Sequence, residues 1–172
     1  MKPYVKPLTL SDAPEKSKPI LKAINDNFGQ SLNIFSTAAY QPDILGGMTQ
    51  INEGIRNDLP EKFRELAYFM ASQINQCDYC SHYHKQAARQ AGLSEEQLSA
   101  VENYQTSDKF DDQEKAVLSY SEQLTKNAKV DRNVIDELKK FLDEKQMVSL
   151  AGTVALANFT NRFNHGLDIQ LP

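Results

Sequence analysis

Apolar residues recur at steps of three and four along most of this sequence, and that period constrains the fold more than any other feature. The clearest stripe follows Pro60 and contains Phe63, Leu66, Ala67, Met70, Ala71 and Ile74. Because residues at these steps share one face of a helix, the segment predicts an amphipathic helix with one buried face. No segment alternates apolar and polar residues between hairpin turns, as a half-buried strand would. We therefore expect an all-α fold of about seven or eight helices.

Capping signals and apolar spacing divide the rest of the chain into further helices. Ser94 with Gln97, and Asp111 with Glu114, match the pattern in which two residues cap a helix start reciprocally. Gly92 is a typical end for a helix that begins at residues 77–78. The other expected helices cover residues 15–28, a short turn around 34–35, 42–55, a segment that begins at Asp131 and bears Phe141 and Leu142, and 144–164.

The length of 172 residues fits one domain. Pro3, Pro7 and Pro14 discourage regular structure near the N-terminus. We expect residues 1–14 to form an extended N-terminal arm and residues 15–172 to form a single helical domain.

Charge and hydropathy exclude several classes of protein. The net charge of -4 argues against a general nucleic-acid binder, which usually carries a basic surface. No apolar run approaches the length of a membrane-spanning helix, and no secretory signal peptide is visible. We therefore expect a protein of the reducing cytoplasm without a membrane partner. Two cysteines in that compartment indicate redox chemistry or metal binding rather than a static structural bridge.

Both cysteines and two of the three histidines lie within the eight residues from Cys77 to His84. A helix that begins at Asp78 would place Cys77 at or near its N-cap and Cys80 about one turn further on. His84 follows Cys80 by four residues, so the two side chains share a helix face. The sulfurs of Cys77 and Cys80 can then meet as a disulfide when one of them is oxidised.

The start of a helix favours the reactive form of a thiol. Backbone N–H groups and the positive end of the helix dipole stabilise an anion there, and a protonated imidazole nearby adds to the effect. Both lower the pKa of a cysteine thiol from its usual value of about 8.5. A thiolate within reach of peroxide becomes a sulfenic acid, which a second thiol traps as a disulfide. Such a cycle needs an outside reductant and no cofactor.

Glu65 is a candidate proton acceptor for this chemistry. It lies twelve residues before Cys77, at the edge of the apolar stripe of the preceding helix. The spacing alone does not bring Glu65 to the thiols, and an isolated glutamate on a helix usually points into solvent.

Glu65, Cys77, Cys80 and His84 together form the pattern Glu-x(11)-Cys-x-x-Cys-x-x-x-His. This pattern resembles the alkyl hydroperoxidase D (AhpD)-like branch of the carboxymuconolactone decarboxylase family, and in particular its uncharacterised peroxidase-related members. The resemblance extends over about residues 40–168 and includes the flanking segments 63–67, 83–87 and 157–168.

The resemblance implies an AhpD-like helical fold, assembly into a dimer, trimer or hexamer, and reduction of hydrogen peroxide or small organic hydroperoxides. By analogy, Cys80 attacks the peroxide and Cys77 resolves the sulfenic acid and meets an unknown dithiol reductant. Glu65 and His84 relay protons. The best-known members carry a histidine between the two cysteines, where this chain has Tyr79. The decarboxylase branch lacks the cysteine pair, so lactone decarboxylation is not expected here.

Two other functions remain open from the residues alone. One is a redox-sensing or assembly protein whose dithiol is oxidised without turnover. The other is a zinc-stabilised helical domain that uses Cys77, Cys80 and His84, with His82 or His165 as a fourth ligand. Structural zinc sites usually show a second paired motif, which this sequence lacks. A thioredoxin-type function is excluded by the absence of the strands which that fold needs.

Overall fold

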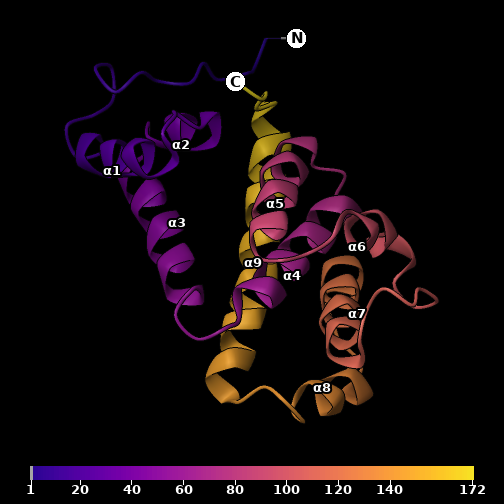
Figure 1. The fold of residues 1–172 in the computed structure, drawn as a ribbon. Helices are drawn as coiled ribbons and strands as arrows, with labels where there is room; N and C mark the ends of the chain where they lie inside the picture. The colour runs from indigo at the N-terminus through magenta and orange to yellow at the C-terminus, as the bar shows by residue number, and fades with distance from the viewer. Residues whose placement is uncertain (1) are drawn as a thin grey trace. The chain divides into compact units, whose positions relative to one another are not determined.

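The structure is a computed structural model that describes residues 2–172. These residues form nine α-helices and one 3₁₀ turn and contain no strand, which confirms the all-α fold (Figure 1). The count exceeds the expected seven or eight. The helices are Lys18–Phe28 (α1), Asn33–Ala38 (α2), Pro42–Ile55 (α3), Glu61–Ile74 (α4), Asp78–Gln90 (α5), Glu95–Ala100 (α6), Asp112–Asn127 (α7), Arg132–Leu138 (α8) and Glu144–Leu167 (α9); the 3₁₀ turn is Val101–Asn103.

Helix boundaries follow the capping signals at most ends. Both capping boxes, at Ser94 and at Asp111, are present with reciprocal hydrogen bonds. Asp131 occupies the N-cap of α8, but its side chain makes no capping hydrogen bond, and the helix ends at Leu138. The predicted extension of this helix to Phe141 and Leu142 is therefore wrong. α9 instead runs three residues beyond the predicted end at residue 164.

The chain packs as two compact units. The first contains the residues up to Glu53 together with 162–172, and the second contains residues 54–161. The expectation of a single domain over residues 15–172 stays a prediction.

In the first unit, the N-terminal residues lie beside the C-terminal end of the chain. The backbone N–H of Tyr4 donates to the carbonyl of Leu167 at 3.1 Å, and that of Leu8 donates to Ser36 at 3.1 Å. The Asn33 side chain donates to the carbonyl of Gln170 at 2.9 Å. Residues 2–14 contain no helix and are tied down by these hydrogen bonds.

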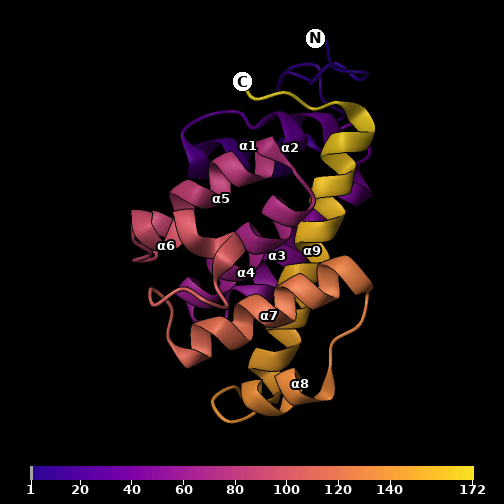
Figure 2. The ribbon, with the colours of Figure 1, turned by 90° about the vertical axis from the view of Figure 1, so that its right-hand side faces the viewer.

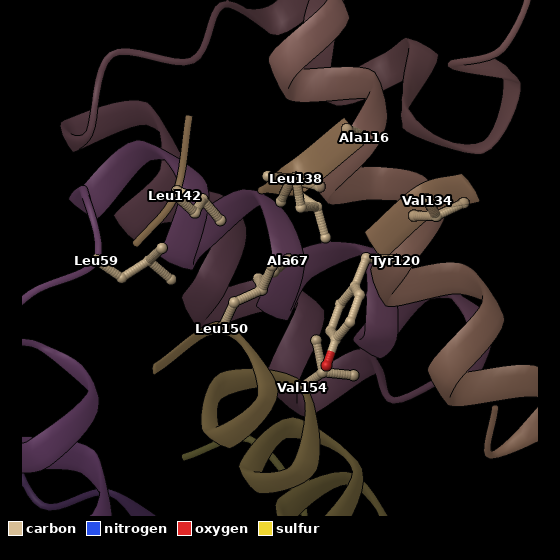
Figure 3. Packing of buried hydrophobic residues seen from close by; sticks show 10 residues of the cluster. Leu59, Ala67, Ala116, Tyr120, Val134, Leu138, Leu142, Leu150 and Val154 are labelled. Atoms are coloured by element: carbon tan, nitrogen blue, oxygen red, sulfur yellow. The ribbon is translucent and has the colours of Figure 1, made fainter. Parts of the chain in front are cut away.

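The second unit is built around α4, which packs against both α5 and α7 (Figures 1 and 2). One apolar cluster joins α4 to α7, α8 and α9, and Figure 3 shows its side chains converging from these helices. A second cluster lies on another side of α4 and includes Leu66, Met70, Ala88 and Leu118. Leu66 and Ala67 are neighbours in sequence but point into different clusters, because successive residues differ by about 100° around a helix.

This double packing buries nine consecutive residues of α4, from Arg64 to Ser72. The prediction of one buried face is therefore incomplete, since the polar side chains of Arg64, Glu65 and Ser72 are buried as well. Glu65 is only 6% exposed, unlike an ordinary glutamate on a helix surface. Buried polar groups need hydrogen-bond partners, and the partners of Glu65 define the site below.

Candidate functional site

The corner between α4 and α5 fixes the position of the cysteine pair. The backbone N–H of Cys77 donates to the carbonyl of Ser72 at 2.9 Å, and that of Gln76 donates to Gln73 at 3.0 Å. These two hydrogen bonds form the Schellman motif that commonly ends an α-helix. The motif requires a left-handed residue, and Gln76 adopts it with φ of 55°. Cys77 then caps α5 with its side chain, so a single residue closes one helix and opens the next.

The two sulfur atoms lie in contact at the start of α5. They are 2.7 Å apart and are thiols in this structure, with the Cys77 thiol donating to the Cys80 sulfur. The backbone N–H of Cys80 donates to the Cys77 sulfur at 3.3 Å, as an N-cap contact requires. Cys77 is 2% exposed and Cys80 is 4% exposed. The predicted location of the pair at a helix N-terminus is confirmed.

Glu65 contacts His84 across the packed faces of α4 and α5. The Glu65 Oε2 lies 2.7 Å from the His84 Nδ1, and the other carboxylate oxygen accepts from the Arg64 Nε at 3.1 Å. Burial alone would raise the pKa of Glu65, but His84 and Arg64 outweigh it and hold that pKa below its ordinary value. Glu65 is therefore an anion at neutral pH, and His84 donates its Nδ1 proton to it. In the neutral ring this leaves Nε2 as the proton acceptor.

The arrangement answers the question that the spacing left open. Glu65 reaches the site through its hydrogen bond to His84 and not through a contact with the thiols that the sequence spacing would predict. His84 in turn shares a helix face with Cys80. A carboxylate that orients an imidazole beside a nucleophile is a recurring arrangement for moving protons.

Tyr68 was missed by the sequence reasoning, although it lies three residues after Glu65 on the same side of α4. Its ring stacks on the His84 ring with centroids 3.5 Å apart and an angle of 15° between the planes. Its hydroxyl is hydrogen-bonded to the Thr160 hydroxyl of α9. Burial, together with the nearby Cys80 and Glu65, raises the pKa of Tyr68, so the phenol stays protonated.

A chain of amides joins the α4–α5 corner to α9 and was also missed. The Asn75 Nδ2 donates to the side-chain oxygens of Asn158 at 3.0 Å and Asn161 at 2.8 Å. Asn161 in turn donates to the Ser72 hydroxyl at 3.2 Å. The only available signal was the segment 157–162 that entered the resemblance. The network anchors the residues immediately before Cys77.

The geometry gives no support to the zinc-stabilised alternative. Within residues 2–172, no group of three or more His, Cys, Asp or Glu side chains is arranged to hold a metal ion. His84 points its Nδ1 at Glu65, while His82 and His165 are exposed.

Within residues 2–172, no helix has both the length and the apolar character needed to cross a membrane.

Comparisons with known proteins agree with the fold. The model of the carboxymuconolactone decarboxylase family matches residues 42–123, which contain the whole cysteine motif and Glu65. The uncharacterized protein YdfG of Bacillus subtilis (strain 168) is 29% identical over 103 residues, which are 59% of this chain and 70% of that protein.

Solved structures match nearly the whole chain. The debrominase Bmp8 superposes with a TM-score of 0.82 at 25% identity, over 98% of this chain and 91% of that one. A variant of Bmp8 in complex with 2,3,4-tribromopyrrole gives 0.84 at 24% identity, over 100% and 93%. An alkylhydroperoxidase AhpD core, an uncharacterized peroxidase-related protein from Ralstonia eutropha JMP134, gives 0.84 at 20% identity, over 99% and 92%. Over residues 42–123 this chain is therefore similar to the carboxymuconolactone decarboxylase family, and its fold is AhpD-like.

Proposed function

We propose that this chain is a thiol-dependent peroxidase that reduces hydrogen peroxide or small organic hydroperoxides. The observation that carries the proposal is the contact between the Cys77 and Cys80 sulfurs, at 2.7 Å, on the helix that also presents His84 to Glu65. Such a site holds a nucleophile, a second thiol and a proton relay together. Similarity in fold to peroxidase-related proteins supports the same class of chemistry.

In the oxidative half of the cycle, the Cys80 thiolate attacks the terminal oxygen of the hydroperoxide. The S–O bond forms as the O–O bond breaks, and the departing alkoxide takes the proton that Cys80 gave to His84. The products are a sulfenic acid on Cys80 and an alcohol, or water from hydrogen peroxide. Glu65 keeps the imidazole oriented through its hydrogen bond to Nδ1.

In the reductive half, the Cys77 thiol attacks the sulfenic sulfur of Cys80, which releases water and closes the disulfide. An external dithiol then attacks the disulfide, forms a mixed disulfide and leaves as its own oxidised form, which restores both thiols. The net reaction converts a hydroperoxide and a dithiol into an alcohol, water and a disulfide. Both cysteines are nearly fully buried, so a dithiol larger than a small molecule needs the first turn of α5 to open.

The test is peroxide consumption with dithiothreitol or a dihydrolipoyl donor as reductant. We expect many turnovers for the unaltered protein and none for Cys77→Ser or Cys80→Ser. A sulfenic acid trap should label Cys77→Ser, which retains Cys80, and should not label Cys80→Ser. The reverse labelling pattern would exchange the two roles. Consumption of a single equivalent would support the redox-sensing alternative instead.

Reductive debromination is a second candidate, favoured by the match of nearly the whole chain to the debrominase Bmp8. The same dithiol could supply the two electrons: a bromopyrrole and two thiols would give the debrominated pyrrole, a disulfide and hydrogen bromide. Release of bromide from 2,3,4-tribromopyrrole, dependent on both cysteines and faster than peroxide turnover, would favour this function over the peroxidase.

A further inference from the structure

Tyr68 lies against the imidazole of His84. Its ring is stacked on His84, which is hydrogen-bonded to Glu65, and burial together with the charge of Cys80 raises the pKa of its phenol. The tyrosine is 6% exposed and is carried by the middle of α4, where side chains on both sides restrict its movement. No step of the proposed cycle uses this residue, although it makes the closest ring contact to the imidazole.

The hydrogen bonds of Thr160 decide what the phenol does. The single hydroxyl proton of Thr160 is directed at the carbonyls of Leu156 and Ala157, at 3.0 and 3.1 Å, and a carbonyl can only accept. The assignment that satisfies all three contacts has the Tyr68 hydroxyl donating to the Thr160 oxygen. Its proton points at α9 and away from His84, so the phenol is badly placed to protonate a departing alkoxide. The ring, rather than the hydroxyl, is the part of Tyr68 that meets the site.

We infer that Tyr68 is a positioning residue for His84: its ring holds the imidazole plane, and its hydroxyl is anchored on Thr160. An imidazole on a single helix can rotate about its side-chain bonds, and one hydrogen bond to Glu65 fixes one nitrogen but not the plane of the ring. A parallel aromatic face at 3.5 Å removes that remaining freedom. The Nδ1 then stays on Glu65, and the ring keeps one orientation on α5.

This inference rests on the proposed role of the dithiol, so its test uses readouts that do not need peroxide turnover. The first is the rate at which iodoacetamide alkylates Cys80 in the reduced protein, followed by mass spectrometry. The second is the nitrogen NMR spectrum of His84, which reports its tautomer, together with the ring-current shift of its carbon-bound protons.

Three variants separate positioning from stability. Tyr68→Phe keeps the stacked ring and removes the anchor, whereas Tyr68→Leu removes the ring. Tyr104→Leu is the matched control, because Tyr104 is also buried in the second unit and donates its hydroxyl proton to Glu122 at 2.8 Å, outside the site. Both leucine variants should lower the unfolding temperature by similar amounts.

We expect Tyr68→Leu to lower the Cys80 alkylation rate by up to about 100-fold, the cost that a displacement of about 1 Å in a reacting group can have. Its His84 spectrum should change from the Nδ1–H tautomer to a mixture. Tyr68→Phe should restore most of the rate and keep the upfield ring-current shift, and Tyr104→Leu should leave both readouts unchanged. Equal alkylation rates in Tyr68→Leu and Tyr104→Leu would overturn the inference.

The ring-current shift of His84 can be measured in the unaltered protein, so this test does not depend on whether a variant folds. Absence of the shift would refute the stacking of Tyr68 on His84. Absence of peroxide turnover in the unaltered protein, with the alkylation pattern as expected, would reject the peroxidase and leave the positioning role of Tyr68 standing.

Discussion

Replacing Glu65 by glutamine removes the charge that His84 and Arg64 share while keeping the size and shape of the side chain. In the structure the carboxylate accepts from the His84 Nδ1 at 2.7 Å and from the Arg64 Nε at 3.1 Å. A glutamine can present its oxygen to only one of these donors, and its amide nitrogen then faces the other. Arg64 keeps its contact with Glu61 at 2.9 Å, so its charge is only partly uncompensated.

The size of the effect follows from burial. Removing one partner of a fully buried ion pair costs about 3–5 kcal/mol, but the His84 side chain is 26% exposed and Arg64 retains a partner. We therefore expect Glu65→Gln to lower the free energy of unfolding by about 2 kcal/mol. Loss of a positioned proton relay reduces rates by at least about 100-fold, which corresponds to about 2.7 kcal/mol of barrier.

The assay is peroxide turnover and Cys80 alkylation, compared with a matched control. Glu114→Gln is that control, because Glu114 is also a buried glutamate paired with a cation, Lys62, at 2.5 Å, and it caps α7 outside the site. Both variants should lose stability, but only Glu65→Gln should lose reactivity at Cys80. If Glu114→Gln slowed alkylation as much as Glu65→Gln, the effect would come from general loosening and the relay would be refuted.

The same variant tests the pH dependence. The pKa of Glu65 in the folded protein lies below its ordinary value of 4.5, so the carboxylate charge stabilises the fold fully above that value. As the pH falls through the folded pKa, this contribution is lost. The difference in unfolding free energy between the unaltered protein and Glu65→Gln should be constant from about pH 7 to 5 and shrink below 4.5. A difference that grows on acidification would contradict the ion pair.

Two further predictions concern the α4–α5 corner. Gln76→Gly should raise the unfolding temperature by about 2 °C, since a left-handed residue with a side chain costs about 1–2 kcal/mol and glycine returns part of this as backbone entropy. Gly92→Ala, at the equivalent position after α5 with φ of 93°, should lower it, and a fall for Gln76→Gly would disprove the strain. Because Cys77 and Cys80 are nearly fully buried, a polymer-linked maleimide should label them far more slowly than N-ethylmaleimide. The difference between the two labelling rates should disappear in mild urea. Equal rates in buffer would contradict the burial of the thiols.

Local signals predicted the helices well because capping acts within three residues. The Ser94 and Asp111 capping boxes form as expected, and so does the N-cap contact of Cys77. The left-handed turn at Gln76 escaped prediction because position 76 holds neither the glycine nor the asparagine that usually marks one. The full extent of burial on α4 was not predictable, because its period reveals an apolar stripe but not the second layer of side chains that covers its polar face.

The contacts of the site become harder to predict as they join residues further apart in sequence. The sulfurs of Cys77 and Cys80 are three residues apart, and helix geometry alone brings them together. Glu65 and His84 are 19 residues apart, and their contact depends on how α4 packs against α5. The number of residues between Glu65 and Cys77 predicts that packing only when the fold is already known. Tyr68 and Thr160 are 92 residues apart, and no spacing rule connects them. A motif therefore reveals the groups that react, whereas the groups that hold them in place depend on the packing of helices distant in sequence. In this chain, Cys80 reactivity in the Tyr68 variants measures how much such a positioning group contributes.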